Sequence, residues 1–210
     1  MNIKNEIKEA FTDNKKIFYV LIIIFIIAIF LGYMLTDYLK EILMPLLKEA
    51  MNSTDISEND ALNILVHNET TAILTLISSI FFAVMPVLSI FVNGFAVGFL
   101  AGYTIDSTYK LAMFFVLIAP HGIFEIPALL CTCTSGILLF LSILRILQDK
   151  INGFTFKESY NNNKKTLKQM IILFIIAMLL FLIAAIVEGY ITPYLGNVIS
   201  LQFGQAKIFG

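Results

Sequence analysis

The sequence contains a run of 19 residues, Ile17 to Leu35, without a single charged side chain. About 20 apolar residues in a helix cross the hydrocarbon core of a bilayer, which is roughly 30 Å thick. The run is longer than the core of a signal peptide, and no small-residue cleavage site follows it. A second run, Met170 to Val187, holds 18 residues and no charge. We therefore expect a membrane-spanning helix at each of these places.

The composition supports a membrane protein and excludes other classes. Hydrophobic residues make up 59% of the 210 residues and charged residues 14%, against roughly 45–50% and about 25% in soluble domains. A soluble globule of this size cannot hide so many apolar side chains, and disorder needs high charge. The net charge of −1 gives no basic footprint for nucleic acid. We expect a single membrane domain over residues 1–210.

Two long apolar stretches, Thr71 to Tyr103 and Leu111 to Leu144, lie between these runs. Breaker residues interrupt both: Pro86 and the turn-like pair Asn93-Gly94 in the first, and Pro120, Gly122 and Pro127 in the second. Proline removes a backbone donor and clashes with the preceding helical turn, so we expect no continuous helix through residues 120–127. The predicted fold is all-α, a polytopic transmembrane helix bundle of about five spans with broken or re-entrant helices in the middle.

The positions of the charges predict the orientation. Residues 1–16 and 145–168 hold ten of the fourteen basic residues, whereas residues 37–70 hold two basic residues and seven acids. The positive-inside rule then places the 1–16 tail and the 145–168 loop in the cytoplasm, and the 37–70 loop and the C-terminus outside the cell membrane. Within the external loop, Tyr38 to Met51 has the pattern of an amphipathic helix on the outer surface or on a partner. The alternative is an extension of the first span.

Three glycines, Gly94, Gly98 and Gly102, follow one another at intervals of four residues. This spacing puts them on one face of a helix, where the absence of side chains lets a second backbone approach closely. Close packing of helices is the favoured interpretation, and a dimer interface or a thin pore wall are the alternatives.

Ionisable residues are rare in the apolar stretches, and three of them attract attention: His121, Glu125 and Glu188. An acid within a span costs a few kcal/mol and usually marks a pathway or a partner. Because the fourth and fifth spans are antiparallel, both acids fall at the outer end of the membrane, and Asn93 and Asn68 can join this layer through hydrogen bonds. The residues form either a polar site for a proton, cation or substrate, or hydrogen bonds to free backbone amides of broken helices. The sequence favours the second interpretation.

No sequence motif points to catalysis or to a metal. Cys131 and Cys133 are badly spaced for a disulfide and are interpreted as small core residues. Phosphate-binding loops, nucleophile elbows and zinc-protease motifs do not occur. We expect no catalytic residue, no cofactor and no metal, and hence a protein that is not an enzyme.

Three blocks carry a resemblance to a known family: Phe91 to Gly98, the Pro-His-Gly-x-x-Glu-x-Pro-Ala block from Pro120 to Ala128, and Glu188 to Pro193. In their order and spacing they resemble the stage II sporulation protein M family. The resemblance implies a polytopic membrane protein. The namesake works in endospore formers with a membrane-anchored cell-wall hydrolase and a partner protein, as an assembly platform during engulfment.

The leading functional hypothesis is a non-enzymatic membrane scaffold. Its expected partners are the lipid bilayer, other membrane proteins and a second copy of the chain bound through the Gly94, Gly98 and Gly102 face. The rival hypothesis is a small transporter or channel component that uses Glu125 and Glu188 within proline-broken helices. A water-accessible cavity at Glu125 favours transport, whereas acids bonded to backbone amides favour a scaffold.

Overall fold

The chain folds into helices throughout the part that the structure describes. The structure is a computed structural model that describes residues 3–53 and 61–206, with side chains for residues 3–45 and 61–201. No strand occurs in these ranges, which confirms the all-α prediction. The elements are α1 (Ile3–Asp13), α2 (Lys15–Met34), α3 (Thr36–Ser53), α4 (Ala61–Ser78), α5 (Val84–Thr104), α6 (Thr108–Ile151), α7 (Phe156–Ile186), the π-helical turn η1 (Val187–Ile191) and α8 (Thr192–Ala206).

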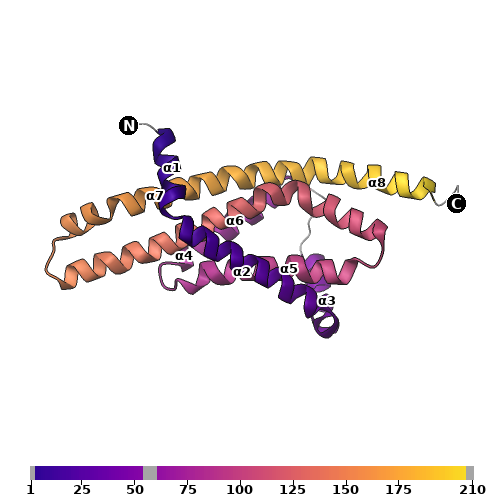
Figure 1. Cartoon of the computed structure of the whole chain (residues 1–210), viewed down its shortest axis with the longest axis horizontal. Coiled ribbons are helices and arrows are strands. Elements are labelled where there is room, and N and C mark those ends of the chain that lie inside the picture. The colour runs from indigo at the N-terminus through magenta and orange to yellow at the C-terminus, as the bar shows by residue number, and fades with distance from the viewer. Residues whose placement is uncertain (1–2, 54–60, 207–210) are drawn as a thin grey trace.

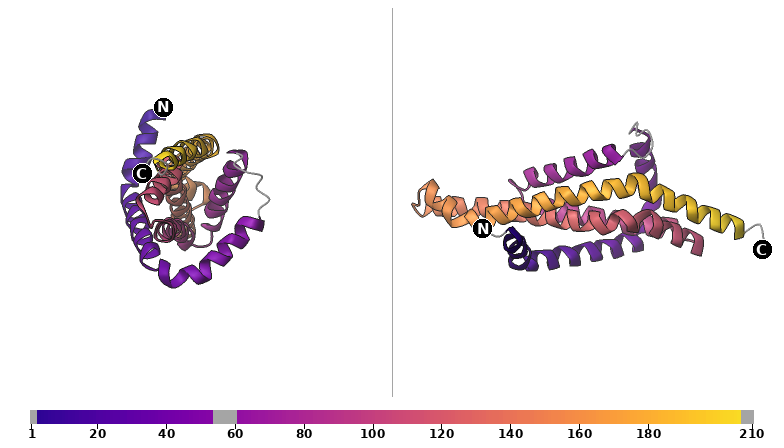
Figure 2. Two further views of the ribbon diagram at one scale, coloured as in Figure 1. Left: turned by 90° about the vertical axis from the view of Figure 1, so that its right-hand side faces the viewer. Right: turned by 90° about the horizontal axis from the view of Figure 1, so that it is seen from above.

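Four helices in the described part of the chain are long and apolar enough to cross a membrane. They are α2, α5, α6 and the continuous helix from Phe156 to Leu201, which contains α7 and η1 and runs into α8. Helix α4 is shorter and carries His67, Asn68 and Glu69, yet it lies beside these helices and runs opposite to α2 (Figures 1 and 2). The chain therefore passes along the bundle in α2, α4, α5, α6 and α7, which is the membrane bundle expected from the sequence.

The two basic segments meet at one end of the bundle. Helix α1 packs on α7 at this end, and the turn that joins α6 and α7 projects beyond it (Figure 1). Residues 145–168 are an extension of the two helices with a turn at 152–155, and not the loop that the sequence suggested. Thr155 and Glu158 form a capping box, which begins α7 at this point.

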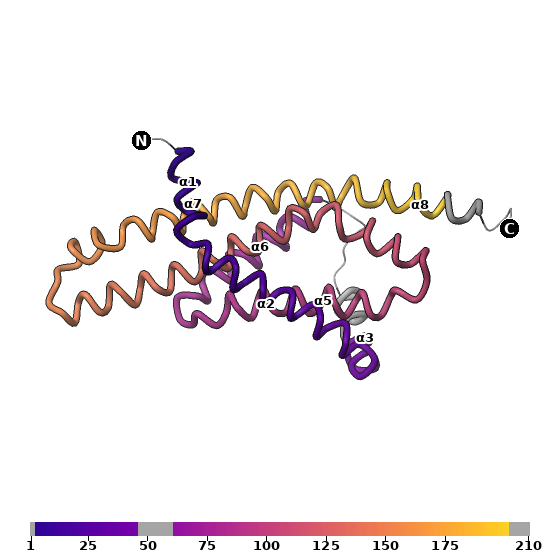
Figure 3. The backbone as a smooth tube through the Cα atoms, viewed as in Figure 1, coloured from indigo at the N-terminus to yellow at the C-terminus, as the bar shows by residue number. Residues whose placement is uncertain are grey.

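The predicted break at residues 120–127 is absent. Helix α6 continues through Pro120 and Pro127 for 44 residues, and Figure 3 shows that it bends along its course. A bend is the usual response of a helix to proline, and packed neighbours allow a membrane helix to tolerate the lost hydrogen bond. The irregular backbone lies instead at η1, where a π-turn separates α7 from α8.

The predicted turn at Asn93-Gly94 is also wrong, because both residues lie in the middle of α5. The chain reverses earlier, between Ser78 and Val84. Pro86 follows in the first turn of α5, where its missing N–H has no helical partner to lose. Pro86 is thus part of a helix start and does not interrupt a span.

Helix α3 is a separate helix and not an extension of the first span. It follows α2 after Leu35 and runs across the end of the bundle, as the left view of Figure 2 shows. This arrangement fits the predicted amphipathic helix at a membrane surface. The predicted 37–70 loop is thus helical at both ends, and residues 54–60 lie outside the described part of the chain.

Glycines bring α2 and α5 into backbone contact. A Cβ on Gly94 would lie 2.7 Å from the Phe25 carbonyl oxygen, and a Cβ on Gly98 would collide with the carbonyl group of Ile29. On the opposite helix, Gly32 of α2 packs against the Phe95 backbone of α5, and Gly102 packs against the Thr36 side chain. The glycine face is therefore covered by α2 of the same chain, and a second copy would have to bind another face.

Helix α6 is the central helix because a run of small side chains lets its neighbours approach closely. Its six consecutive residues 131–136, Cys-Thr-Cys-Thr-Ser-Gly, are all buried. Helices α2, α4, α5, α7 and α8 all contact α6. Cys131 and Cys133 are free thiols 2% and 0% exposed, in keeping with small core residues.

We predict that Gly98→Ala destabilises the protein by about 1–3 kcal/mol, since the added methyl group must push the Ile29 backbone away. The measurement is thermal unfolding in mild detergent. Gly122→Ala is the matched control, because its Cβ would meet its nearest neighbours at an ordinary 3.9 Å and alanine favours helix. Equal melting temperatures for Gly98→Ala and wild type would contradict the close contact.

Candidate functional site

A pocket of about 100 Å³ lies between four helices of the bundle. Most of its lining is polar, which is unusual for the interior of a membrane bundle. The lining residues are His67, Asn68, Thr71, Ala72 and Thr75 of α4, Ser89 and Asn93 of α5, Glu125, Leu129 and Thr132 of α6, and Phe181 of α7.

Helical spacing explains why these side chains converge. Residues 68, 71, 72 and 75 share one face of α4, and residues 125, 129 and 132 share one face of α6, because each set recurs every three or four positions. Thr132 lies seven positions after Glu125 in the helix, so the pocket extends for about 10 Å along α6.

The lining divides into an exposed rim and a buried floor. His67, Thr71 and Asn93 are exposed, and Glu125 retains 33% of its side-chain exposure. Thr132, in contrast, is 1% exposed, and Phe181 beside it is 4% exposed. The pocket therefore leads from accessible polar groups down to a buried threonine.

The Thr132 hydroxyl is buried without a hydrogen-bond partner. A buried, unsatisfied polar group costs about 1–3 kcal/mol, and native structures contain few of them. An ordered water or a bound ion is one way in which such a group is satisfied. Four buried polar atoms of the described residues have no partner, and Thr132 is the one of these residues that lines the pocket, where a bound ion or water would satisfy its hydroxyl.

The structure brings together most of the residues that the sequence singled out. Glu125 and Asn93 line the pocket. His121 lies one turn before Glu125, with its Nε2 atom 3.9 Å from the Glu125 Oε2 atom. Glu188, on η1, is near enough to Glu125 and His67 to interact with them electrostatically. His121 and Glu188 thus flank the pocket without lining it.

The backbone-capping interpretation of the acids finds no support in the contacts. Within residues 61–201, neither Glu125 nor Glu188 accepts a hydrogen bond from a backbone amide, and the charged contact of Glu125 is with His121. The Asn93 side chain donates from Nδ2 to the Ser89 carbonyl oxygen at 2.9 Å, so its Oδ1 atom keeps its accepting capacity. Both acids are partly buried, and Glu125 is the one that faces the pocket.

Sequence reasoning overlooked the hydroxyl groups of the pocket. Thr71, Thr75, Ser89 and Thr132 resemble ordinary small residues of a membrane helix, which pack or bond to their own backbone. The helical spacing of Thr71 and Thr75 with Asn68 is the one signal that could have indicated a polar face. In the described part of the chain, no group of three or more His, Cys, Asp or Glu residues is placed to hold a metal ion.

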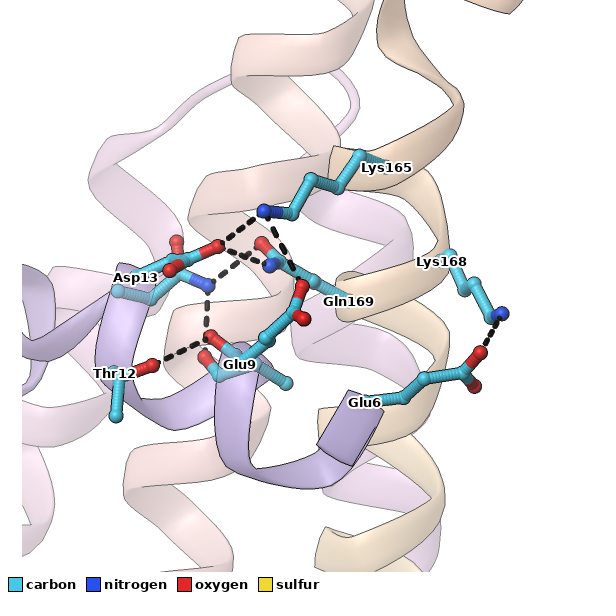
Figure 4. A network of polar contacts seen from close by, with 9 residues as sticks. Glu6, Glu9, Thr12, Asp13, Lys165, Lys168 and Gln169 are labelled. Atoms are coloured by element: carbon cyan, nitrogen blue, oxygen red, sulfur yellow. Dashed lines mark hydrogen bonds and ion pairs between the residues drawn. The ribbon is translucent and has the colours of Figure 1, made fainter. Parts of the chain in front are cut away.

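A second polar cluster joins α1 to α7 at the other end of the bundle (Figure 4). Lys165 contacts Asp13 at 2.8 Å and Glu9 at 3.3 Å, and Lys168 pairs with Glu6. Gln169 donates to Asp13 at 2.8 Å and accepts from Asn14 at 3.0 Å. The acids of the 1–16 segment therefore bind the bases of the 145–168 segment.

Hydrogen bonds from Lys165 and then Gln169 hold the pKa of Asp13 below its usual value, and the same contact with Asp13 raises the pKa of Lys165. A carboxyl group whose pKa is lowered by folding stabilises the folded state fully above its unfolded pKa of about 3.9. This stabilisation is lost as the pH falls through the lower pKa of the folded state. The contact between α1 and α7 is therefore fully formed at neutral pH.

We predict that Asp13→Asn loosens α1, since Lys165 and Gln169 lose a charged acceptor. Amide hydrogen exchange in α1 should become several-fold faster, while wild-type protection, corrected for intrinsic rates, stays constant from pH 8 to 5. High salt should also make amide exchange in α1 of the wild-type protein faster, because salt screens exposed ion pairs. Glu41→Gln, on α3, is the control. Unchanged protection of α1 in Asp13→Asn would show that the network does not hold this helix.

The family model described as "Stage II sporulation protein M" matches residues 21–193. The uncharacterized protein MJ0793 of Methanocaldococcus jannaschii is 34% identical over 131 residues, covering 62% of this chain and 70% of that protein. The uncharacterized protein MJ0706 of the same organism is 30% identical over 200 residues, covering 89% and 86%. No solved structure matches. The chain belongs to the stage II sporulation protein M family.

Proposed function

We propose that this protein is a non-enzymatic, multi-pass membrane protein that takes up a small polar or cationic solute in the pocket around Glu125, as a transporter or a transport component. The observation that carries the proposal is the unpartnered Thr132 hydroxyl at the floor of a polar pocket whose wall holds Glu125. An ionisable residue kept within a membrane bundle is a functional-site hypothesis by default.

The blocks that carry the family resemblance support this site. Asn93 comes from the first block and Glu125 from the second, and both line the pocket. Glu188 opens the third block and interacts electrostatically with Glu125. Three segments far apart in the sequence therefore supply polar groups to one place, which a purely structural role for each would not require.

The packing beyond the pocket fits a site that is closed on one side. Residues 128–136 of α6 are all buried, and Leu129 and Cys133 belong to an apolar cluster with Leu21, Phe25 and Ile90. Passage of a solute past Thr132 would need these helices to move. The bend of α6 and the π-turn η1 are irregularities of the kind that moving membrane helices use.

We predict that Glu125→Gln lowers solute flux at least tenfold, because the amide keeps the shape of the side chain and removes its charge. The measurement uses the purified protein in liposomes that contain dyes sensitive to pH and to Na⁺. Glu69→Gln is the matched control, since it changes an acid on α4 that does not line the pocket. Wild-type flux in Glu125→Gln, or a wild-type protein no faster than empty liposomes, would refute the proposal.

A second candidate function is a scaffold for other membrane proteins. The observation in its favour is the helical hairpin of α6 and α7, which extends past the apolar spans and carries α1 (Figure 1). The ion pairs between α1 and α7 hold α1 against the base of this extension. Charged groups of the network remain accessible, and the Lys165 side chain is 65% exposed. This is a surface suited to a partner with charges of both signs.

For the scaffold we predict that a defined partner co-purifies from native membranes in mild detergent and is lost when residues 146–163 are replaced by a short Gly-Ser turn. The pocket variant Glu125→Gln should keep the partner, which separates the two functions. A monodisperse protein that carries no stoichiometric partner would argue against assembly.

A further inference from the structure

We propose that the pocket is a site for a monovalent inorganic cation such as Na⁺, held by the Glu125 carboxylate and by neutral oxygens that include the Thr132 hydroxyl. The proposal rests on the proposed function, of which it names the solute. It starts from two independent observations: a polar pocket with one acid in its wall, and a fully buried hydroxyl in the same pocket without a partner.

The charge of the lining matches a single positive charge. Glu125 is the one acid among the lining residues, and no lysine or arginine lines the pocket. Glu188 lies outside the lining and adds negative potential from η1, whereas His67 and His121 carry charge only when protonated. A monovalent cation balances Glu125, while an anion would face two carboxylates and find no fixed positive charge.

The neutral groups of the pocket are mainly oxygen donors. Asn68 and Asn93 offer amide oxygens, and Asn93 has its Nδ2 group occupied by the Ser89 carbonyl. Hydroxyl groups come from Thr71, Thr75, Ser89 and Thr132. Carboxylate, carbonyl and hydroxyl oxygens suit hard cations, whereas soft metals prefer thiolate and imidazole ligands. Cys131 and Cys133, which could hold a soft metal, do not line the pocket.

The volume of the pocket suits a partly hydrated ion. One buried water needs only about 10–15 Å³ of such a cavity, so a pocket of about 100 Å³ has room for a small ion with part of its water. The Thr132 hydroxyl, 1% exposed, would be the deepest ligand, and the exposed Asn93 would stand at the entry. The ion would thus lose most of its water on the way from Asn93 to Thr132.

The test uses the full-length protein in lipid nanodiscs at pH 8, prepared in N-methylglucamine chloride without Na⁺. Binding of radioactive ²²Na⁺ and the melting temperature are measured against added NaCl at constant ionic strength. We expect saturable binding of one Na⁺ per chain and a melting temperature that rises with the logarithm of Na⁺ above its dissociation constant. N-methylglucamine chloride alone should give neither effect.

Two variants and two controls define the site. Glu125→Gln should abolish Na⁺ binding, and Thr132→Val should weaken it at least tenfold while the Na⁺-free melting temperature stays at or above that of wild type. Thr134→Val is the matched control, because Thr134 is also a buried threonine of α6 with an unpartnered hydroxyl but lies outside the pocket. Glu69→Gln is the control for charge. Both controls should bind Na⁺ as wild type does.

Three outcomes would overturn the cation site: no Na⁺-specific response, wild-type binding in Thr132→Val, or a response to Ca²⁺ that exceeds the response to Na⁺. The outcome for transport is separate. Flux that depends on Glu125 but persists without Na⁺ on either side would refute the cation site and leave the proposed function intact. Saturable Na⁺ binding without any flux would refute the proposed transport function and leave the cation site intact.

Discussion

Close contact between helices without bulky side chains is the condition on which this bundle depends. In a bilayer, lipid tails are as apolar as leucine, so helices associate through tight packing and hydrogen bonds and not through the hydrophobic effect. The glycine face of α5 against α2 and the small residues 131–136 of α6 supply this packing. Ser135 adds a hydrogen bond from its hydroxyl to the Met170 carbonyl oxygen of α7 at 3.1 Å. The bundle is therefore held by backbone approach in two places, with α6 in the middle.

The pocket borders the tightly packed segment of α6 and extends from it toward Glu125. Small residues close the bundle from Cys131 to Gly136, and Thr132 belongs at once to this closed segment and to the floor of the pocket. From Leu130 back to Ile126 the side chains of α6 are apolar, so the pocket's polar groups around Glu125 come from α4 and α5. One helix thus combines the rigid core of the protein with the charged group of the candidate site, which fixes the carboxylate relative to the packed bundle.

The sequence predicted the parts of the fold that follow from charge and apolarity alone. The spans at α2 and α7, the common end of the two basic segments and the packing role of Gly94, Gly98 and Gly102 all have a local signal. The break at Pro120 to Pro127 was wrong, because neighbouring helices stabilise a bent helix that proline would break in isolation. Thr132 and the Asp13–Lys165 contact could not be predicted, since each depends on residues distant in the sequence that only the folded bundle brings together.

The π-turn η1 inserts an extra residue into the long helix formed by α7 and α8. A π-turn holds one more residue than an α-turn, and the helices on either side continue without a break. The Gly189 backbone packs against Ala61 at this point, so the π-turn is held against the start of α4. Gain or loss of one residue here would rotate Glu188 to another direction while α7 and α8 kept their paths. Family members could therefore differ in where this acid points through a single insertion or deletion, without any change in the architecture around it.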